Sequence, residues 1–168
     1  MPAILKYPRG KIVTDLLHWE DLQPGFSLQL GSYFLSQDEL IQFARQYDPQ
    51  TFHVDPELAK QSPLGCLCAS GLQTTAITQR LTVDELFAKT HLVAGLGVDK
   101  LRFYTPVLPD ETLSASMVVR KAFRTPGSKD RGIVIYDVEV TNPREEKVSS
   151  MQATIMVMCR NTESEANS

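Results

Sequence analysis

The chain has 168 residues, of which 42% are hydrophobic, and its formal net charge is -3. This length suits one domain, and that hydrophobic content allows an ordinary packed core. The charged residues form no basic stripe that would follow a phosphate backbone, so no nucleic-acid partner is expected. All apolar stretches are far shorter than a membrane span needs, so no membrane association is expected either.

The cysteine content favours a reducing compartment. The three cysteines are too few for a disulfide framework, and their odd number would leave one thiol unpaired: Cys66, Cys68 and Cys159. A signal peptide is not indicated, because the first residues, MPAILKYPRGKIV, lack a long apolar core and a cleavage site. We therefore expect a cytoplasmic protein. Since no cluster of His or Cys completes a site with Cys66 and Cys68, we expect no metal and no other cofactor.

The first part of the chain indicates a strand followed by a helix. Residues 1–18 show little periodicity and are expected to form an N-terminal extension. Residues 26–35 alternate as a strand does. Ser36 and Glu39 have the spacing of a capping box, and apolar residues at helical spacing follow them up to the next proline. Asp48 is therefore placed at a helix end, where the chain changes direction.

Two further helices are indicated by their start signals. Asp55 followed by Pro56 is a favourable N-cap and first-residue pair for a short helix. Ser70 and Gln73 have the spacing of another capping box, at the start of a helix expected over residues 71–89. Frequent Ala, Thr and Gly early in that helix suit tight packing against a sheet.

After residue 92 the pattern changes to strands, which are expected over residues 97–104, 112–123, 132–141 and 147–159. One long helix against a curled antiparallel sheet is an α+β architecture. The edge strands of such a sheet invite pairing with a second copy. A single domain is expected over residues 19–160, with a disordered tail at 161–168. The aromatic residues expected in its core are Trp19, Phe34, Phe43, Phe87 and Phe103.

Asp48 and His53 are the first candidates for chemistry. They lie five residues apart across a proline-bearing segment. A helix would place residues at that spacing on different faces, whereas a loop that doubles back aims both side chains at one point. An acid and an imidazole that share one water form a workable acid–base pair, because both can be tuned toward neutral pH. Taken alone, a pair of this kind is more often structural.

Gly71 adds a hydrogen-bond donor to this pair. As the first helical residue behind Ser70, it keeps an orphan N–H at the positive end of the helix dipole. Because Gly71 has no side chain, a ligand carbonyl can approach closely. These properties suit an oxyanion hole for a thioester enolate, where losing one such donor raises the barrier by about 3–4 kcal/mol. A glycine required only for close helix–sheet packing is the equal alternative.

The residues around these candidates resemble a known family. FARQYDPQTFHVDP at residues 43–56 resembles the hydratase motif of MaoC-like dehydratases and R-specific enoyl-CoA hydratases, in which an Asp is followed five residues on by a His and then by another Asp. Residues 64–72 resemble the family's segment leading into its central helix. Residues 97–107 and 109–113 resemble its strand–turn–strand pattern. The resemblance extends over residues 19–159.

This resemblance implies a hot-dog fold, in which a curled antiparallel sheet wraps a long central helix, in a dimeric double hot-dog. It implies that Asp48 and His53 hold and activate a water, while the Gly71 amide binds the thioester oxygen. The implied reaction is reversible addition of water to an enoyl thioester of CoA or of an acyl carrier protein, by a homodimer. Further candidates for substrate contacts are Ser70, Gln50, Phe52 and Arg102.

The sequence departs from the family's usual pattern at several positions. The family usually has Asn-Pro where Gln50 and Thr51 stand here, and Pro49 comes one place earlier. Ser70 stands where the enoyl hydratases usually carry His, and Gln79 matches a helix serine that often supports the catalytic Asp. Two alternative functions stay open: a hot-dog acyl-CoA thioesterase, and a non-catalytic protein that binds acyl thioesters.

Overall fold

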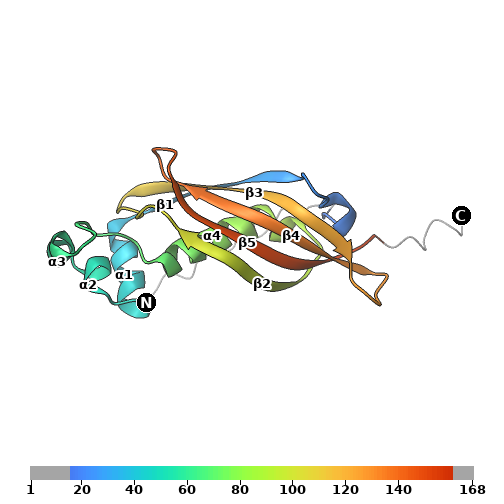
Figure 1. Ribbon diagram of the computed structural model, residues 1–168, viewed down its shortest axis with the longest axis horizontal. Helices are drawn as coiled ribbons and strands as arrows, with labels where there is room; N and C mark the ends of the chain where they lie inside the picture. The colour runs from blue at the N-terminus through green and yellow to red at the C-terminus, as the bar shows by residue number, and fades with distance from the viewer. Residues whose placement is uncertain (1–15, 161–168) are drawn as a thin grey trace, which may run out of the picture.

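A computed structural model describes residues 16–160 of the chain (Figure 1). The expected tail at 161–168 and most of the expected N-terminal extension lie outside the described residues. Where the described part begins, Leu17 forms an isolated bridge with Thr90 and so contacts the body of the domain. No helix within residues 16–160 has the length and apolar character needed to cross a membrane.

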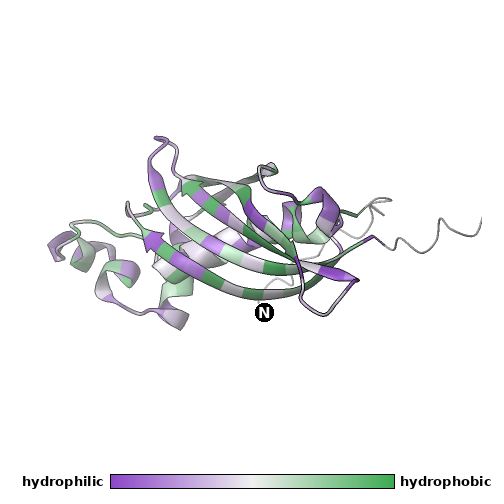
Figure 2. Ribbon diagram, turned by 45° about the vertical axis from the view of Figure 1, so that its right-hand side comes forward, coloured by the Kyte–Doolittle hydropathy of each residue, from purple (hydrophilic) through white to green (hydrophobic). Residues whose placement is uncertain are grey.

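One antiparallel sheet of five strands forms the larger layer, in the order β1-β3-β4-β5-β2. Hydrophobic and hydrophilic residues alternate along its strands (Figure 2), because successive side chains of a strand point to opposite faces. The strands are β1 (Ser27–Leu35), β2 (Leu92–Phe103), β3 (Glu111–Arg124), β4 (Arg131–Thr141) and β5 (Lys147–Met158). The buried residues of β3, β4 and β5 fall mostly at alternate positions and so gather on one face.

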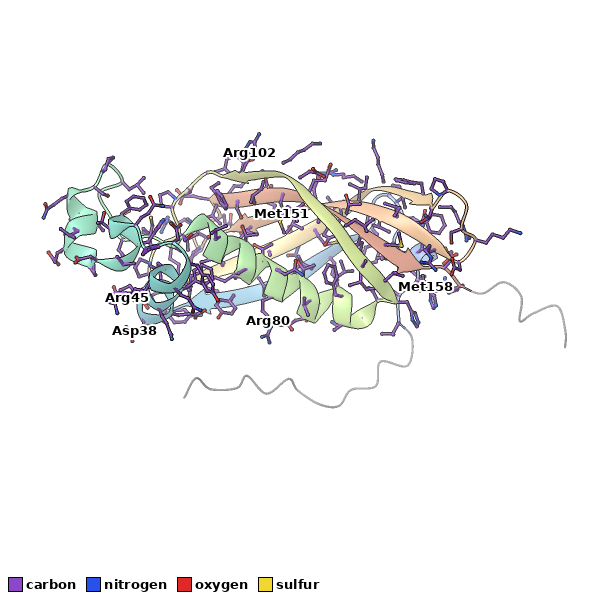
Figure 3. All side chains as sticks on the ribbon, turned by 90° about the horizontal axis from the view of Figure 1, so that it is seen from below. Asp38, Arg45, Arg80, Arg102, Met151 and Met158 are labelled. Atoms are coloured by element: carbon purple, nitrogen blue, oxygen red, sulfur yellow. The ribbon has the colours of Figure 1, made fainter. Side chains whose placement is uncertain are left out.

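The long helix α4 (Gly71–Glu85) lies across one face of this sheet (Figure 3). Three of its buried threonines, Thr74, Thr78 and Thr82, donate their hydroxyl hydrogens to the carbonyl oxygens four residues earlier. These hydroxyls are therefore satisfied within the helix and need no partner from the sheet. A long central helix wrapped by a curled antiparallel sheet is the hot-dog fold, so the expected α+β class is confirmed.

Three small helices gather at one end of the sheet (Figure 1): α1 (Gln37–Tyr47), α2 (Thr51–Val54) and α3 (Pro56–Gln61). The Ser36 hydroxyl caps α1 by accepting from the Glu39 amide at 3.3 Å. The expected return bond is absent there, because the Glu39 carboxylate accepts from the Tyr33 hydroxyl at 2.6 Å. Asp55 caps α3 as expected.

Three elements differ from the sequence prediction. Helix α2 was not predicted, since four residues are too few to show a period. The helix expected over residues 71–89 ends at Glu85, and a separate 3-10 turn, η2 (Phe87–Lys89), follows it. Strand β2 begins at Leu92 rather than at residue 97, because glycines at positions 95 and 97 weaken the strand pattern.

Two aromatic residues expected in the core are exposed instead: Phe34 is 58% and Phe103 is 51% accessible. They lie on β1 and β2, the two edge strands of the sheet. An edge strand has a neighbour on one side only, so its side chains are covered less completely than the same residues would be in a central strand. Alternation alone does not distinguish these two environments.

Trp19 packs directly on the backbone of Gly132. A Cβ at position 132 would lie 2.7 Å from Cγ of Trp19 and nearer still to its Nε1. The indole is held there by a 3.3 Å hydrogen bond to the Ile133 carbonyl and by the Arg124 guanidinium over its ring.

We expect Gly132→Ala to lower the free energy of unfolding by about 1–3 kcal/mol, because the added methyl group overpacks this contact. Equilibrium urea denaturation measures the change.

Gly132→Ala in a Trp19→Ala background is the matched control, because the indole that the added Cβ would meet is then absent. We expect the loss of stability to be much smaller in that background. Equal losses of stability in the two backgrounds would show that Trp19 is not the cause.

Candidate active site

Asp48 and His53 are brought together by the turn between two helices. Asp48 is the C-cap of α1, which ends before Pro49, and His53 is the third residue of α2. His53 Nε2 lies 3.6 Å from Asp48 Oδ2. The two side chains therefore meet as the spacing predicts, although a short helix carries His53 where a loop was expected.

The His53 ring is buried and its orientation is fixed by the backbone. Nδ1 lies 2.7 Å from the carbonyl oxygen of Cys68. Since a carbonyl oxygen only accepts, Nδ1 carries a hydrogen, and in the neutral ring the lone pair is on Nε2, the atom that faces Asp48. The Phe52 ring packs edge-on against the imidazole with a centroid separation of 4.5 Å. Phe52 thus supports His53 from the neighbouring position.

Both carboxylate oxygens of Asp48 accept hydrogen bonds. The Ser70 hydroxyl donates to Oδ2 at 2.6 Å, and the Gln50 amide donates to Oδ1 at 2.8 Å. Hydrogen bonds to the charged form favour it. The Ser70 bond, followed by the Gln50 bond and a smaller electrostatic contribution from His53, therefore lowers the pKa of Asp48 below its ordinary value. At neutral pH this group is an ionised acceptor.

Ser70 connects Asp48 to the start of α4. Its oxygen accepts from the Leu72 amide at 3.2 Å while its hydrogen goes to Asp48. No hydrogen bond within the described residues involves the N–H of Gly71, which is a free donor at the positive end of the helix. The Phe103 ring covers this glycine closely, since a Cβ at position 71 would lie 2.7 Å from the ring.

A pocket of about 280 Å³ opens beside these groups and has a largely apolar wall. It is lined by His53 and Gly71 together, so these two residues border one space. A larger hollow of about 600 Å³ lies over the sheet and is lined by neither residue. The smaller pocket is therefore the candidate substrate pocket, because His53 and Gly71 line it. Other residues in its lining are Cys68, Thr74, Phe103, Tyr104 and Val148.

The remaining candidates occupy different places. Ser70 and Gln50, predicted as substrate contacts, both donate to Asp48. Arg102 lies on the exposed β2 edge (Figure 3), where its guanidinium donates to the Leu101 carbonyl at 2.8 Å. Gln79, placed at the supporting position, is exposed farther along α4, and Ser70 supports the carboxylate in its stead.

The role of Ser70 was missed because its partner is 22 residues away in the chain. Its sequence signals were the N-cap position directly before the helix glycine and the place where the enoyl hydratases usually carry His, and neither names Asp48 as its partner. Between residues 16 and 160, no group of three His, Cys, Asp or Glu side chains is arranged to hold a metal ion.

Comparison with known proteins identifies the family. Residues 23–142 match the family described as MaoC like domain. The chain is 31% identical to "Uncharacterized protein YdeM" of Bacillus subtilis (strain 168) over 123 residues, which cover 73% of this chain and 86% of that protein. The chain belongs to the MaoC-like dehydratase family.

Solved structures share the fold over most of the chain. The MaoC-like dehydratase from Rhodospirillum rubrum is 32% identical with a TM-score of 0.81, over 86% of this chain and 99% of that one. R-hydratase PhaJ1 from Pseudomonas aeruginosa is 22% identical with a TM-score of 0.69, over 86% of this chain and 88% of that one. At the latter identity, the likeness shows the fold alone.

Ser70→Ala tests the hydrogen bond that lowers the pKa of Asp48. Removing the donor should raise this pKa toward its ordinary value of 3.8, as followed by a carboxyl NMR titration. Ser36→Ala is the matched control, because Ser36 caps α1 without a hydrogen bond to Asp48. An unchanged Asp48 pKa in Ser70→Ala would contradict the assignment.

The same pair of variants has a defined pH dependence of stability. Each loses an N-cap, which costs about 1 kcal/mol. Ser70→Ala should lose more above pH 3.8, because a lowered carboxyl pKa stabilises the fold only while the group is ionised. This additional loss should disappear as the pH falls through the lowered pKa of Asp48 in the wild type. An additional loss that grows toward acid pH would have the wrong sign.

Proposed function

We propose that this protein is a hydratase or dehydratase that adds water reversibly across the α,β double bond of an enoyl thioester. One observation carries the proposal: the acceptor atoms Asp48 Oδ2 and His53 Nε2 lie 3.6 Å apart, and His53 lines the same pocket as Gly71, whose N–H has no hydrogen-bond partner among the described residues. Membership of the MaoC-like dehydratase family supports the same class of reaction.

The dyad suits the binding of one reactive water. Asp48 is ionised, and the His53 ring in its neutral form presents the lone pair of Nε2. One water that donates a hydrogen to each then satisfies both acceptors. The lone pairs of that water are then free to attack the β carbon of the substrate. As the C–O bond forms, one dyad member takes a proton from the water, and the dyad then delivers that same proton to the α carbon. One whole water is thereby added and both groups return to their starting states, so they act as a coupled pair.

Gly71 supplies the electrostatic part of the reaction. The thioester oxygen accepts a hydrogen bond from the Gly71 N–H, and negative charge grows on this oxygen as the β carbon is attacked. A fixed donor therefore stabilises the transition state more than the ground state. Because His53 and Gly71 line the same pocket, water attack and oxyanion stabilisation take place in one space.

The carrier of the acyl group is CoA or an acyl carrier protein, both of which hold the acyl group on the thiol of a phosphate-bearing arm. Arg102 is an exposed cation on β2, the strand that continues into Phe103 over Gly71, and it suits a contact with such a phosphate. A cytoplasmic location is part of the proposal, and the three free thiols, Cys66, Cys68 and Cys159, are compatible with it.

The first test follows the loss of enoyl absorbance when the purified protein is given crotonyl-CoA. We expect Asp48→Asn and His53→Ala each to lower kcat/KM at least about 100-fold, because each removes one acid–base group. Asp38→Asn, an exposed carboxylate in the first turn of α1, is the control and should retain full activity. Circular dichroism should show that all three variants stay folded.

Retained hydration in either dyad variant would remove Asp48 and His53 from the reaction. The two alternative functions give other results. A thioesterase would release free thiol from saturated acyl-CoA, and a non-catalytic binding protein would bind crotonyl-CoA without consuming it.

We also propose that two copies pair through β2 to form a double hot-dog. Among the described strands, β2 has only β5 as a neighbour, so within residues 16–160 no strand pairs with the backbone groups of its other edge. Leu96 and Val98 on this strand are each 50% exposed, and Phe103 lies on the same strand. An edge with apolar side chains of this size is a typical surface for association.

Sedimentation measures this assembly directly. We expect a dimer at micromolar concentration for the wild type. Leu96→Lys should shift the equilibrium toward monomer, because a charge would be buried without a partner at the interface. Leu58→Lys, an exposed leucine on α3, is the matched control and should leave the dimer intact. A monomeric wild type would remove the proposal.

A further inference from the structure

A groove of about 450 Å³ lies between α1, α4 and β1, apart from the pocket at His53 and Gly71. Within the described part of the chain, the linings of the groove and of that pocket share no residue. Figure 3 shows Arg80, which lines the groove, on the opposite side of α4 from Arg102 on β2. The proposed reaction and the proposed pairing through β2 therefore leave this surface unused.

The lining of the groove is mainly apolar. Two polar pairs along it are already satisfied: the Tyr33 hydroxyl donates to Glu39 at 2.6 Å, and Arg80 pairs with Asp84 at 2.7 Å. Tyr47 is 59% exposed there, although it is a large aromatic residue. An apolar hollow that contains an exposed ring is a typical surface for binding another segment of protein. The apolar part of the lining is formed by Phe43, Tyr47, Ala76, Ile77 and Leu81.

The groove extends along α4 to the end of that helix. Ala76, Arg80 and Asp84 line it in succession at a spacing of four residues, so they form one continuous stripe on the helix. The distance from Ala76 to Asp84 along the helix axis is about 12 Å. At the other end lies Tyr47, the last residue of α1, which the hydrogen bond from Ser70 holds at the start of α4.

The described chain begins beside the Asp84 end of the groove. Leu17 N donates to the Lys89 carbonyl oxygen at 2.8 Å, and His91 N donates to the Leu17 carbonyl oxygen at 2.9 Å. The bridge between Leu17 and Thr90 is parallel, so the chain reaches Leu17 from the side of η2, the turn that follows α4. Residues 1–15 are therefore attached to the domain close to the point where the groove ends.

Residues 1–15 have the reach to cover the groove. An extended chain spans about 3.3 Å per residue, so about four residues cover the stretch from Ala76 to Asp84. Pro2 and Pro8 disfavour a helix in this segment and favour an extended chain. The segment also has large apolar residues that match the apolar lining: Ile4, Leu5, Tyr7, Ile12 and Val13.

The charges of the segment and of the groove are opposite in sign. Lys6, Arg9 and Lys11 give the segment three cations, and its first acidic residue is Asp15. The lining of the groove holds two carboxylates, one from α1 and one from α4, and a single guanidinium. Electrostatic attraction therefore favours the approach of this basic segment to this side of α4.

We propose that residues 4–13 of the same chain lie in this groove in an extended form and run in the same direction as α4. Val13 lies toward Asp84, and the residues before it continue toward Tyr47. The segment covers the exposed Tyr47 ring and packs α1 against α4, so it supports the helix that ends at Asp48. This inference goes beyond the proposed function, because it requires neither a thioester nor a hydration step.

Photo-crosslinking on the full chain, with p-benzoylphenylalanine in place of Tyr47, tests this proposal. After irradiation, cleavage at acidic residues releases residues 1–15 as one peptide, because Asp15 is their first acid. We expect mass spectrometry to find this peptide joined to position 47. The matched control has the same photoreactive residue in place of Tyr104, which is 56% exposed and lies outside the groove, and it should not capture the peptide.

Two changes should remove the capture. Ala76→Trp places an indole in the groove and should abolish it, whereas Gln79→Trp, at an exposed position of α4 outside the lining, should leave it intact. Reversing the charges of Lys6, Arg9 and Lys11 to glutamate should weaken the capture. These three residues lie outside the described part of the chain, so this variant provides the test if Ala76→Trp does not fold.

A mixture of isotope-labelled and unlabelled protein separates capture within one chain from capture between two copies. Hybrid cross-links would overturn the proposal, as would a yield that rises with protein concentration, because docking of a tethered segment is intramolecular. Failure of position 47 to capture the peptide, or equal capture from position 104, would also overturn it. The same holds if the charge reversal leaves the yield unchanged.

Discussion

The hydrogen bond from Ser70 to Asp48 joins the two halves of the candidate site. This bond is 2.6 Å long and connects the end of α1 to the start of α4. The same serine oxygen caps α4 by accepting from the Leu72 amide. One side chain thus holds the carboxylate ionised and sets its position relative to Gly71, the next residue in the chain. The acid–base pair and the amide donor therefore share one connection, which sets their positions relative to each other.

Much of the fold follows from local patterns. Alternation located β1, β3, β4 and β5 to within a residue or two, and the N-cap serines located the starts of α1 and α4. The patterns failed where neighbours decide the outcome. Phe103 is a large apolar residue of the kind expected in a core, yet it lies exposed on an edge strand. No local pattern reveals which strand will be at the edge of the sheet.

The site could be predicted only in part for the same reason. The spacing of Asp48 and His53 is local, and the structure brings these side chains together. The groups that hold them come from farther away: the Cys68 carbonyl is 15 residues from His53, and Ser70 is 22 residues from Asp48. The buried amide of Gln73 is likewise a product of tertiary packing, because its bond to Glu39 spans 34 residues.

The partner of the His53 ring has a consequence for sequence divergence. Nδ1 is held by a main-chain carbonyl, which every amino acid at position 68 would supply. The backbone therefore fixes the tautomer of the imidazole, and substitutions of the surrounding side chains leave this hydrogen bond in place. The carboxylate is different, since Ser70 and Gln50 hold it through side chains that a single codon change removes. Substitutions at these two positions can therefore change the acidity of the carboxyl group while the imidazole keeps the same tautomer.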